Sequence, residues 1–151
     1  MINRRHYIQL AIHPIAPSFA RSHIDRVLRG IEREELTAPT QLIASELVTG
    51  AIKASGLRTP TYEEIEQFGM YAGVEDFTTI WLGIYPISDG IVLEVWDLSR
   101  NPPILAALDI GDHCGQGVFL VDLISECWGY HRPKTGGKVV WAKLNREAAG
   151  Q

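Results

Sequence analysis

The chain has 151 residues, 46% of them hydrophobic and 21% charged, which fits one folded domain and excludes wholesale disorder. Its net charge of −4 argues against a nucleic-acid-binding protein, because phosphate recognition normally requires a basic face. Cys114 and Cys127 are expected to be reduced thiols. Without a signal-peptide pattern or an apolar stretch of membrane-spanning length, we expect a single cytoplasmic domain over 1–151, with an ordered core over about 5–145 and no membrane contact.

The first part of the chain predicts one strand followed by two helices. Residues 6–12 alternate in the manner of a strand. Apolar residues at helical spacing then predict a helix over about 18–35, with charges on its opposite face. Thr37 is expected to be the N-cap of a second helix, which runs to about Ser55 and is ended by Gly56.

The middle of the chain changes from helical to strand-like patterns. Tyr62 to Phe68 is expected to form a short surface helix. Residues 77–87 and 91–97 are rich in β-branched and aromatic side chains, which favour strands. The intervening Ser88-Asp89-Gly90 is typical of a hairpin turn.

The last part predicts a loop, a helix and a strand. Residues 98–114 are expected to form a long loop, apolar residues from Leu120 through Cys127 and Trp128 have helical spacing, and 138–144 form a strand after a glycine pair. The order is therefore strand, two helices, hairpin, helix and strand. This order predicts an α/β fold, a two-layer α/β sandwich whose sheet is mixed but mostly antiparallel and carries helices on one face.

Three residues of the second helix lie on one face, because Glu46, Gly50 and Lys53 are spaced i, i+4 and i+7. A glutamate in this position can act as general base toward a hydroxyl nucleophile in phosphoryl transfer. Taken singly, Glu46 also fits a solvated helix glutamate, and Lys53 also fits a surface lysine. Both interpretations stay open at this point.

Asp97 ends a strand immediately before the long loop, where a carboxylate can bind a ligand or cap a turn. Gly115-Gln-Gly117 precedes a helix, and such a junction offers free backbone N–H groups and the positive end of the helix dipole to an anion. A glycine pair alone is a weak signal. The four tryptophans are expected to pack in the core or on a sheet face rather than to stack on bases.

Together, four segments resemble the histidine-kinase-like ATPase superfamily, also called GHKL, which has the Bergerat fold. The segments are Ser45–Ser55, Leu93–Asp97, Gly115–Val121 and Gly136–Ala142. Within the superfamily, the chain is similar to the small bacterial anti-sigma-factor serine kinases and their single-domain relatives. The resemblance extends from the first strand to about residue 144.

The resemblance implies an ATP- or ADP-binding regulatory protein in which Glu46 is the general base and Asp97 binds the adenine amino group. The loop over 98–114 corresponds to the family's ATP lid. Family members with kinase activity phosphorylate a serine of an antagonist protein and otherwise sequester a sigma factor, and relatives suggest a homodimer. The residues that the resemblance assigns to nucleotide binding are Gly50, Lys53, Asp97, Ser99, Gly115, Gly117 and Val118.

The sequence departs from the family at Gly50, where an asparagine normally holds Mg²⁺ through its carboxamide oxygen. Glycine has no side-chain oxygen, so Mg²⁺ binding is expected to be weakened and no metal-ligating residue is assigned. A glycine is also replaced by Ser99, and another by Cys114. Two functions remain open: a working serine/threonine kinase of the anti-sigma type, and a degenerate pseudokinase of the same fold that acts through protein–protein contacts. A third possibility is a scaffold that never binds ATP.

Overall fold

The computed structural model describes residues 6–54, 62–68, 79–99, 103 and 116–146. The strands are β1 (Ile8–Ala11), β2 (Thr79–Ile87), β3 (Gly90–Asp97), β4 (Cys127–His131) and β5 (Lys138–Asn145). The helices are α1 (Ala16–Gly30), the 3₁₀ helix η1 (Glu34–Leu36), α2 (Thr37–Ala54), α3 (Tyr62–Phe68) and α4 (Gln116–Ile124).

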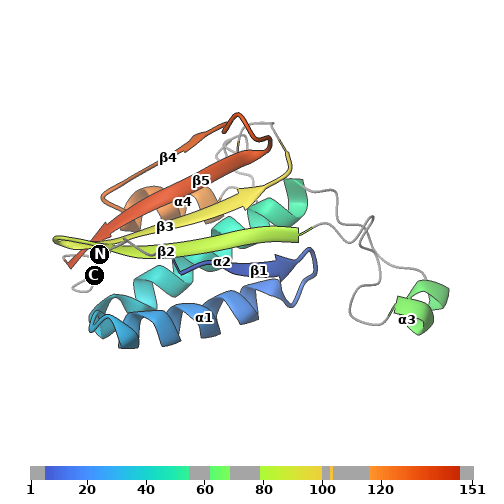
Figure 1. Cartoon of the computed structure of the whole chain (residues 1–151), viewed down its shortest axis with the longest axis horizontal. Coiled ribbons are helices and arrows are strands. Elements are labelled where there is room, and N and C mark those ends of the chain that lie inside the picture. Colours follow the sequence, from blue (N-terminus) through green and yellow to red (C-terminus); the bar gives the residue numbers. More distant parts are fainter. Residues whose placement is uncertain (1–5, 55–61, 69–78, 100–102, 104–115, 147–151) are drawn as a thin grey trace.

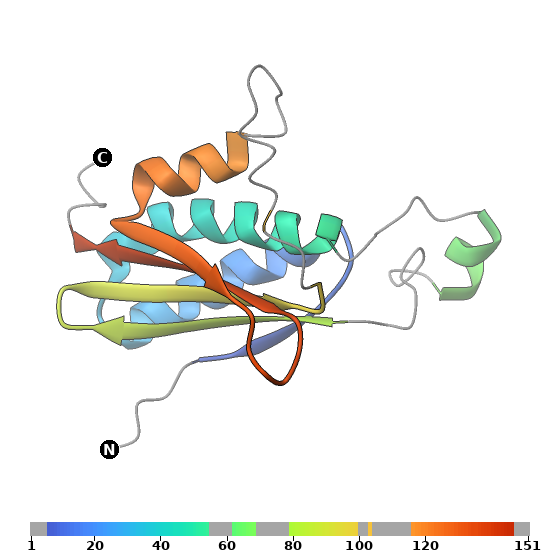
Figure 2. The ribbon, with the colours of Figure 1, turned by 90° about the horizontal axis from the view of Figure 1, so that it is seen from above.

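The five strands form one sheet in the order β1-β2-β3-β5-β4, and α1, α2 and α4 lie side by side over one of its faces (Figures 1 and 2). The α/β class and the layer of helices on one face are therefore confirmed. Every strand pairing in the described ranges is antiparallel, so the expectation of a mixed sheet is not met there.

The core lies between the helices and the inner face of the sheet. On β3, the alternate residues Ile91, Leu93 and Val95 are each at most 1% exposed. On α2, Ile43 and Val48 are fully buried against them in the same cluster. β3 is the central strand and α2 is the central helix. Because both are buried, the residues at their ends are held in fixed positions relative to the core.

The hairpin between β2 and β3 is confirmed, with Ile87 paired to Gly90 across a turn made by Ser88 and Asp89. Arg33 ties the hairpin to the helical layer, since its Nη1 donates to the carbonyl oxygens of Ile87 (3.1 Å) and Gly90 (2.6 Å). The turn lies at the end of the sheet opposite to the C-terminal end of β3 (Figure 1).

Two helix boundaries differ from the sequence expectation. The first helix ends at Gly30 rather than near residue 35, because Glu32 has a left-handed backbone with φ of 59° that a continuing helix cannot accommodate. Thr37 has helical angles (φ −59°, ψ −53°), so it does not have the extended conformation of an N-cap. Instead, η1 leads directly into α2.

The strand β4 was predicted wrongly as the end of a helix. The helix α4 ends at Ile124, and Cys127 and Trp128 belong to β4. The backbone N–H of Glu126 donates to the carbonyl oxygen of Lys143 (2.8 Å) and brings the chain into the sheet. Trp128 then packs against the core from the strand. Trp128 is therefore partly buried against the core, but as part of a strand and not of a helix.

The remaining predictions concern the short helix, the loops, the tryptophans and membrane-spanning segments. The short helix α3 is confirmed, and its Tyr62 is 76% exposed. The expected helix stop at Gly56 and nearly all of the loop over 98–114 lie outside the described residues. The four tryptophans lie on strands β2 to β5, as sheet packing requires. Within the described ranges, no helix combines the length and apolar character needed to cross a membrane.

A buried histidine makes the stability of this fold depend on pH. His23 on α1 is 9% exposed, and its Nε2 lies 2.9 Å from the carbonyl oxygen of His6. Burial lowers the pKa of His23 below 6.5, outweighing the bond to His6, and the charge of Arg26 lowers it further.

Below about pH 6.5 the unfolded chain therefore binds a proton that the folded chain does not, and stability falls. We expect the loss of unfolding free energy between about pH 7.5 and 5.5 to be smaller in His23→Gln than in the wild type, measured by urea denaturation. An equal loss in both proteins would show that other groups cause it.

Candidate functional site

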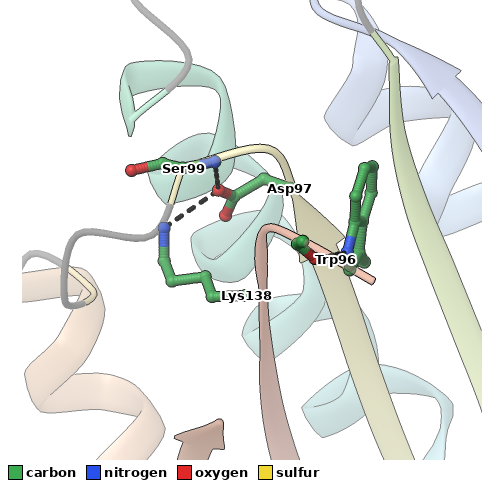
Figure 3. A network of polar contacts seen from close by, with 5 residues as sticks. Trp96, Asp97, Ser99 and Lys138 are labelled. Atoms are coloured by element: carbon green, nitrogen blue, oxygen red, sulfur yellow. Dashed lines mark hydrogen bonds and ion pairs between the residues drawn. The ribbon is translucent and has the colours of Figure 1, made fainter. Parts of the chain in front are cut away.

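A buried ion pair lies at the end of the sheet where β3 finishes and β5 begins. Asp97 and Lys138 are register partners, and the Lys138 Nζ donates to Asp97 Oδ1 at 2.9 Å (Figure 3). Their side chains are 1% and 2% exposed. Asp97 continues the inward series of β3 that includes Leu93 and Val95, so the pair is on the helix-covered face of the sheet.

The hydrogen bonds to Asp97 are uneven between its two oxygens. The backbone N–H of Ser99 donates to Oδ1 at 2.8 Å, so both bonds from described residues reach the same oxygen. Each carboxylate oxygen offers about two acceptor positions, which leaves Oδ2 for a further donor. Among the described residues, the acceptor for the Lys138 ammonium is Asp97 Oδ1, although an ammonium has three donors.

The pair is electrostatically costly. Burial raises the pKa of Asp97 by more than the hydrogen bond and charge of Lys138 and the Ser99 N–H lower it. The desolvation cost of a buried ion pair often exceeds its Coulombic gain, so such a pair is weak grounds for a purely stabilising role. Charged groups with perturbed pKa values concentrate at functional sites, which makes this end of the sheet the strongest candidate.

The glycine pair before β5 allows Lys138 to approach Asp97. Gly137 has φ of +73°, and a Cβ built there would lie 2.2 Å from the carbonyl oxygen of Asp97. Gly136 has φ of +110°, and its carbonyl oxygen accepts a bond from Trp96 Nε1 at 3.0 Å. A side chain at Gly137 would therefore push the start of β5 away from the end of β3.

The helix α2 lies between α1 and α4 and runs toward the same end of the sheet (Figures 1 and 2). Its α1-facing side is marked by Gln41, whose Nε2 donates to the carbonyl oxygen of Arg21 at 3.0 Å. Gly50 follows Gln41 by nine residues, about two and a half helical turns, and so lies on the side facing α4. The shared face of Glu46, Gly50 and Lys53 thus borders the space between α2 and α4.

Each predicted residue on that face has a distinct environment. Glu46 is half-buried, and its carboxylate has no hydrogen bond or ion pair to any other described residue. A Cβ built on Gly50 meets no atom of the described part of the chain within 4 Å, so the described residues leave space for a small side chain there. Lys53 is exposed near the C-terminal end of the helix. No polar contact between described residues joins these side chains to Asp97.

The glycine junction is only partly within the described structure. Gly117 and Val118 lie in the first turn of α4, whose N-terminal end is directed toward the Asp97 end of the sheet (Figure 2). The first N–H groups of such a helix have no partner within it and can bind an anion. Gly115 lies outside the described residues, as does most of the predicted lid.

Lys138 is the residue of this site that the sequence prediction missed. The sequence contained a signal, because Lys138, Val140, Ala142 and Leu144 alternate along β5 and the last three are apolar. A lysine in phase with an inward apolar series is expected to be buried and therefore to need a partner.

Comparison of the sequence with protein-family models and with curated proteins gave no match. The site consists of a buried carboxylate and ammonium at one end of the sheet, on the side toward which α2 runs and the N-terminus of α4 is directed (Figure 2).

Proposed function

We propose that this protein is an ATP-binding regulatory protein of the histidine-kinase-like ATPase type, with a Bergerat fold. The adenine base binds at Asp97, and the phosphates lie between α2 and the N-terminus of α4. The observation that carries the proposal is the buried Asp97 carboxylate, whose Oδ2 accepts no hydrogen bond from a described residue and so keeps acceptor capacity for a donor such as the adenine amino group.

The surroundings of Asp97 support this assignment. Helices cover one face of an antiparallel sheet, as the proposed fold requires. The first turn of α4 supplies backbone N–H groups for the phosphates, which would lie close to Gly117. Lys53 can add a positive charge, and the Glu46 carboxylate, which has no hydrogen bond or ion pair to another described residue, is suited to a general base.

Position 50 favours a second candidate, a degenerate pseudokinase that binds nucleotide weakly and acts through protein contacts. Gly50 provides no oxygen for Mg²⁺, and a Cβ there meets no described atom within 4 Å. The residues present therefore fit an adenine nucleotide but do not fit the family's metal arrangement. An active form would be a cytoplasmic serine/threonine kinase, expected from the resemblance to be a homodimer that phosphorylates an antagonist protein and otherwise sequesters a sigma factor.

Isothermal titration with ADP and ATP, each with and without Mg²⁺, tests the proposal. We expect both nucleotides to bind, with little change when Mg²⁺ is added. Absence of heat together with absence of any thermal shift would refute nucleotide binding, and strong Mg²⁺ dependence would refute the pseudokinase candidate.

Gly50→Asn should raise the affinity for Mg–ATP about tenfold, because it restores one ligand oxygen for Mg²⁺ at a position where a Cβ meets no described atom within 4 Å. Gly50→Ala is the matched control. It should stabilise α2 by about 1 kcal/mol through helix propensity while leaving the Mg²⁺ dependence unchanged. An equal gain in both variants would assign the effect to helix stability, not to metal binding.

A further inference from the structure

We propose that Lys138 contacts the adenine base directly, by donating a hydrogen bond to N1 while Asp97 Oδ2 accepts one from the 6-amino group. This inference rests on the proposed nucleotide site and assigns the residue that determines its base specificity. Lys138 would then be a second base-contacting residue rather than only the counter-ion of Asp97.

The bonding of the pair leaves one donor and one acceptor side by side. The Nζ of Lys138 lies 2.9 Å from Asp97 Oδ1, and the N–H of Ser99 is bonded to that same oxygen. Toward the other described residues, the ammonium retains further donors and Oδ2 retains acceptor positions. The pair therefore presents a donor adjacent to an acceptor, and a ligand edge with an acceptor adjacent to a donor is its complement.

The 6-amino purine edge matches this arrangement better than the 6-oxo purine edge does. Adenine offers one acceptor, N1, beside one donor, the amino group, so each group of the pair makes one bond. Guanine carries the two groups in exchanged positions, with the O6 acceptor where adenine has its amino donor and the N1–H donor where adenine has its N1 acceptor. A guanine held in the same orientation would therefore place O6 against Asp97 Oδ2 and N1–H against the Lys138 ammonium, and neither hydrogen bond could form.

The burial of Asp97 and Lys138 affects both the access of a base to the pair and the strength of the hydrogen bonds that it makes there. Because Asp97 and Lys138 are 1% and 2% exposed, a base contacts them only in a conformation that uncovers them. The population of that conformation reduces the apparent affinity. Once contact is made, the dry surroundings strengthen each hydrogen bond and penalise any group left without a partner, which favours discrimination between bases.

Nucleotide analogues test this inference on the unaltered protein. In 1-deaza-ADP the N1 acceptor is replaced by C–H, whereas in 7-deaza-ADP the N1 and amino edge is unchanged. By titration calorimetry, we expect 1-deaza-ADP to bind at least about tenfold more weakly than ADP, and 7-deaza-ADP to bind within about twofold of it. GDP should bind at least about tenfold more weakly than ADP.

A variant completes the comparison. Lys138→Met keeps the length of the side chain but removes its donors, so it should bind ADP about tenfold more weakly than the wild type and no longer distinguish ADP from 1-deaza-ADP. Lys143→Met is the matched control on the same strand. Lys143 is paired with Glu126 at 3.2 Å and lies an odd number of residues away, on the other face of the sheet, so its loss should leave the discrimination intact.

The outcomes separate this inference from the function on which it rests. Equal binding of ADP and 1-deaza-ADP by the wild type would overturn the role of Lys138 while leaving nucleotide binding established. Tighter binding of GDP than ADP would overturn the adenine assignment. Failure of every nucleotide to bind would overturn the proposed function itself. The wild-type comparison remains decisive even if Lys138→Met does not fold.

Discussion

Asp97→Asn is expected to lower the free energy of unfolding by about 3–5 kcal/mol, because it leaves the Lys138 ammonium buried without a charged partner. Nucleotide binding should also be lost, because a carboxamide accepts through only one oxygen and cannot both hold Lys138 and receive the adenine amino group. Chemical denaturation measures the first effect, and titration with ADP measures the second.

The double variant Asp97→Asn with Lys138→Met distinguishes the two effects. Removing both charges should restore most of the lost stability, because the pair is desolvated at a cost, but it should not restore ADP binding. If the double variant were as unstable as the single one, the stability loss would come from Asp97 itself rather than from an unpaired Lys138.

Gly90→Ala is the second substitution with a large expected effect. A Cβ at Gly90 would lie 1.9 Å from the carbonyl oxygen of Leu144 and 2.8 Å from the Cα of Asn145. Both are backbone atoms of the neighbouring β5, so the clash can be relieved only by separating two central strands. We expect a loss of about 3 kcal/mol or more in unfolding free energy, measured by urea denaturation.

Gly50→Ala is the control, since a Cβ at Gly50 meets no described atom within 4 Å. Gly90 lies at the hairpin end of the sheet, away from Asp97 (Figure 1), so the folded fraction of Gly90→Ala should bind ADP as the wild type does. Unchanged stability of Gly90→Ala would mean that β3 and β5 are farther apart here than the structure shows.

Local patterns sufficed for much of the fold. The β-branched and aromatic composition of residues 91–97 and the hairpin turn at 88–90 each depend on residues close in sequence, and the structure confirms both the strand and the turn. The prediction for the segment that forms β4 was wrong because Cys127 and Trp128 follow the apolar residues of α4 at helical spacing. Their true environment depends on pairing with β5, which is not visible in a local window.

The candidate site was predictable only in part for the same reason. The position of Asp97 at a strand end followed from its own segment, and so did the shared face of Glu46 and Gly50. The partner of Asp97 did not, because Lys138 is 41 residues away and is placed by strand register. The phase of Lys138 along β5 indicated burial, but not which carboxylate it would meet.

Binding of an adenine nucleotide at the Asp97 end of the sheet can be tested most directly through two tryptophan indole signals. Trp96 donates its indole N–H to Gly136, next to the glycine turn that positions Lys138 (Figure 3), whereas Trp128 donates to Asp122, in the last turn of α4, at 3.1 Å. In ¹H–¹⁵N spectra, we expect ADP to shift the Trp96 indole resonance in a saturable manner while the Trp128 resonance stays in place. A saturable shift of Trp128 alone, or no shift of Trp96 at high ADP concentration, would contradict binding at this site.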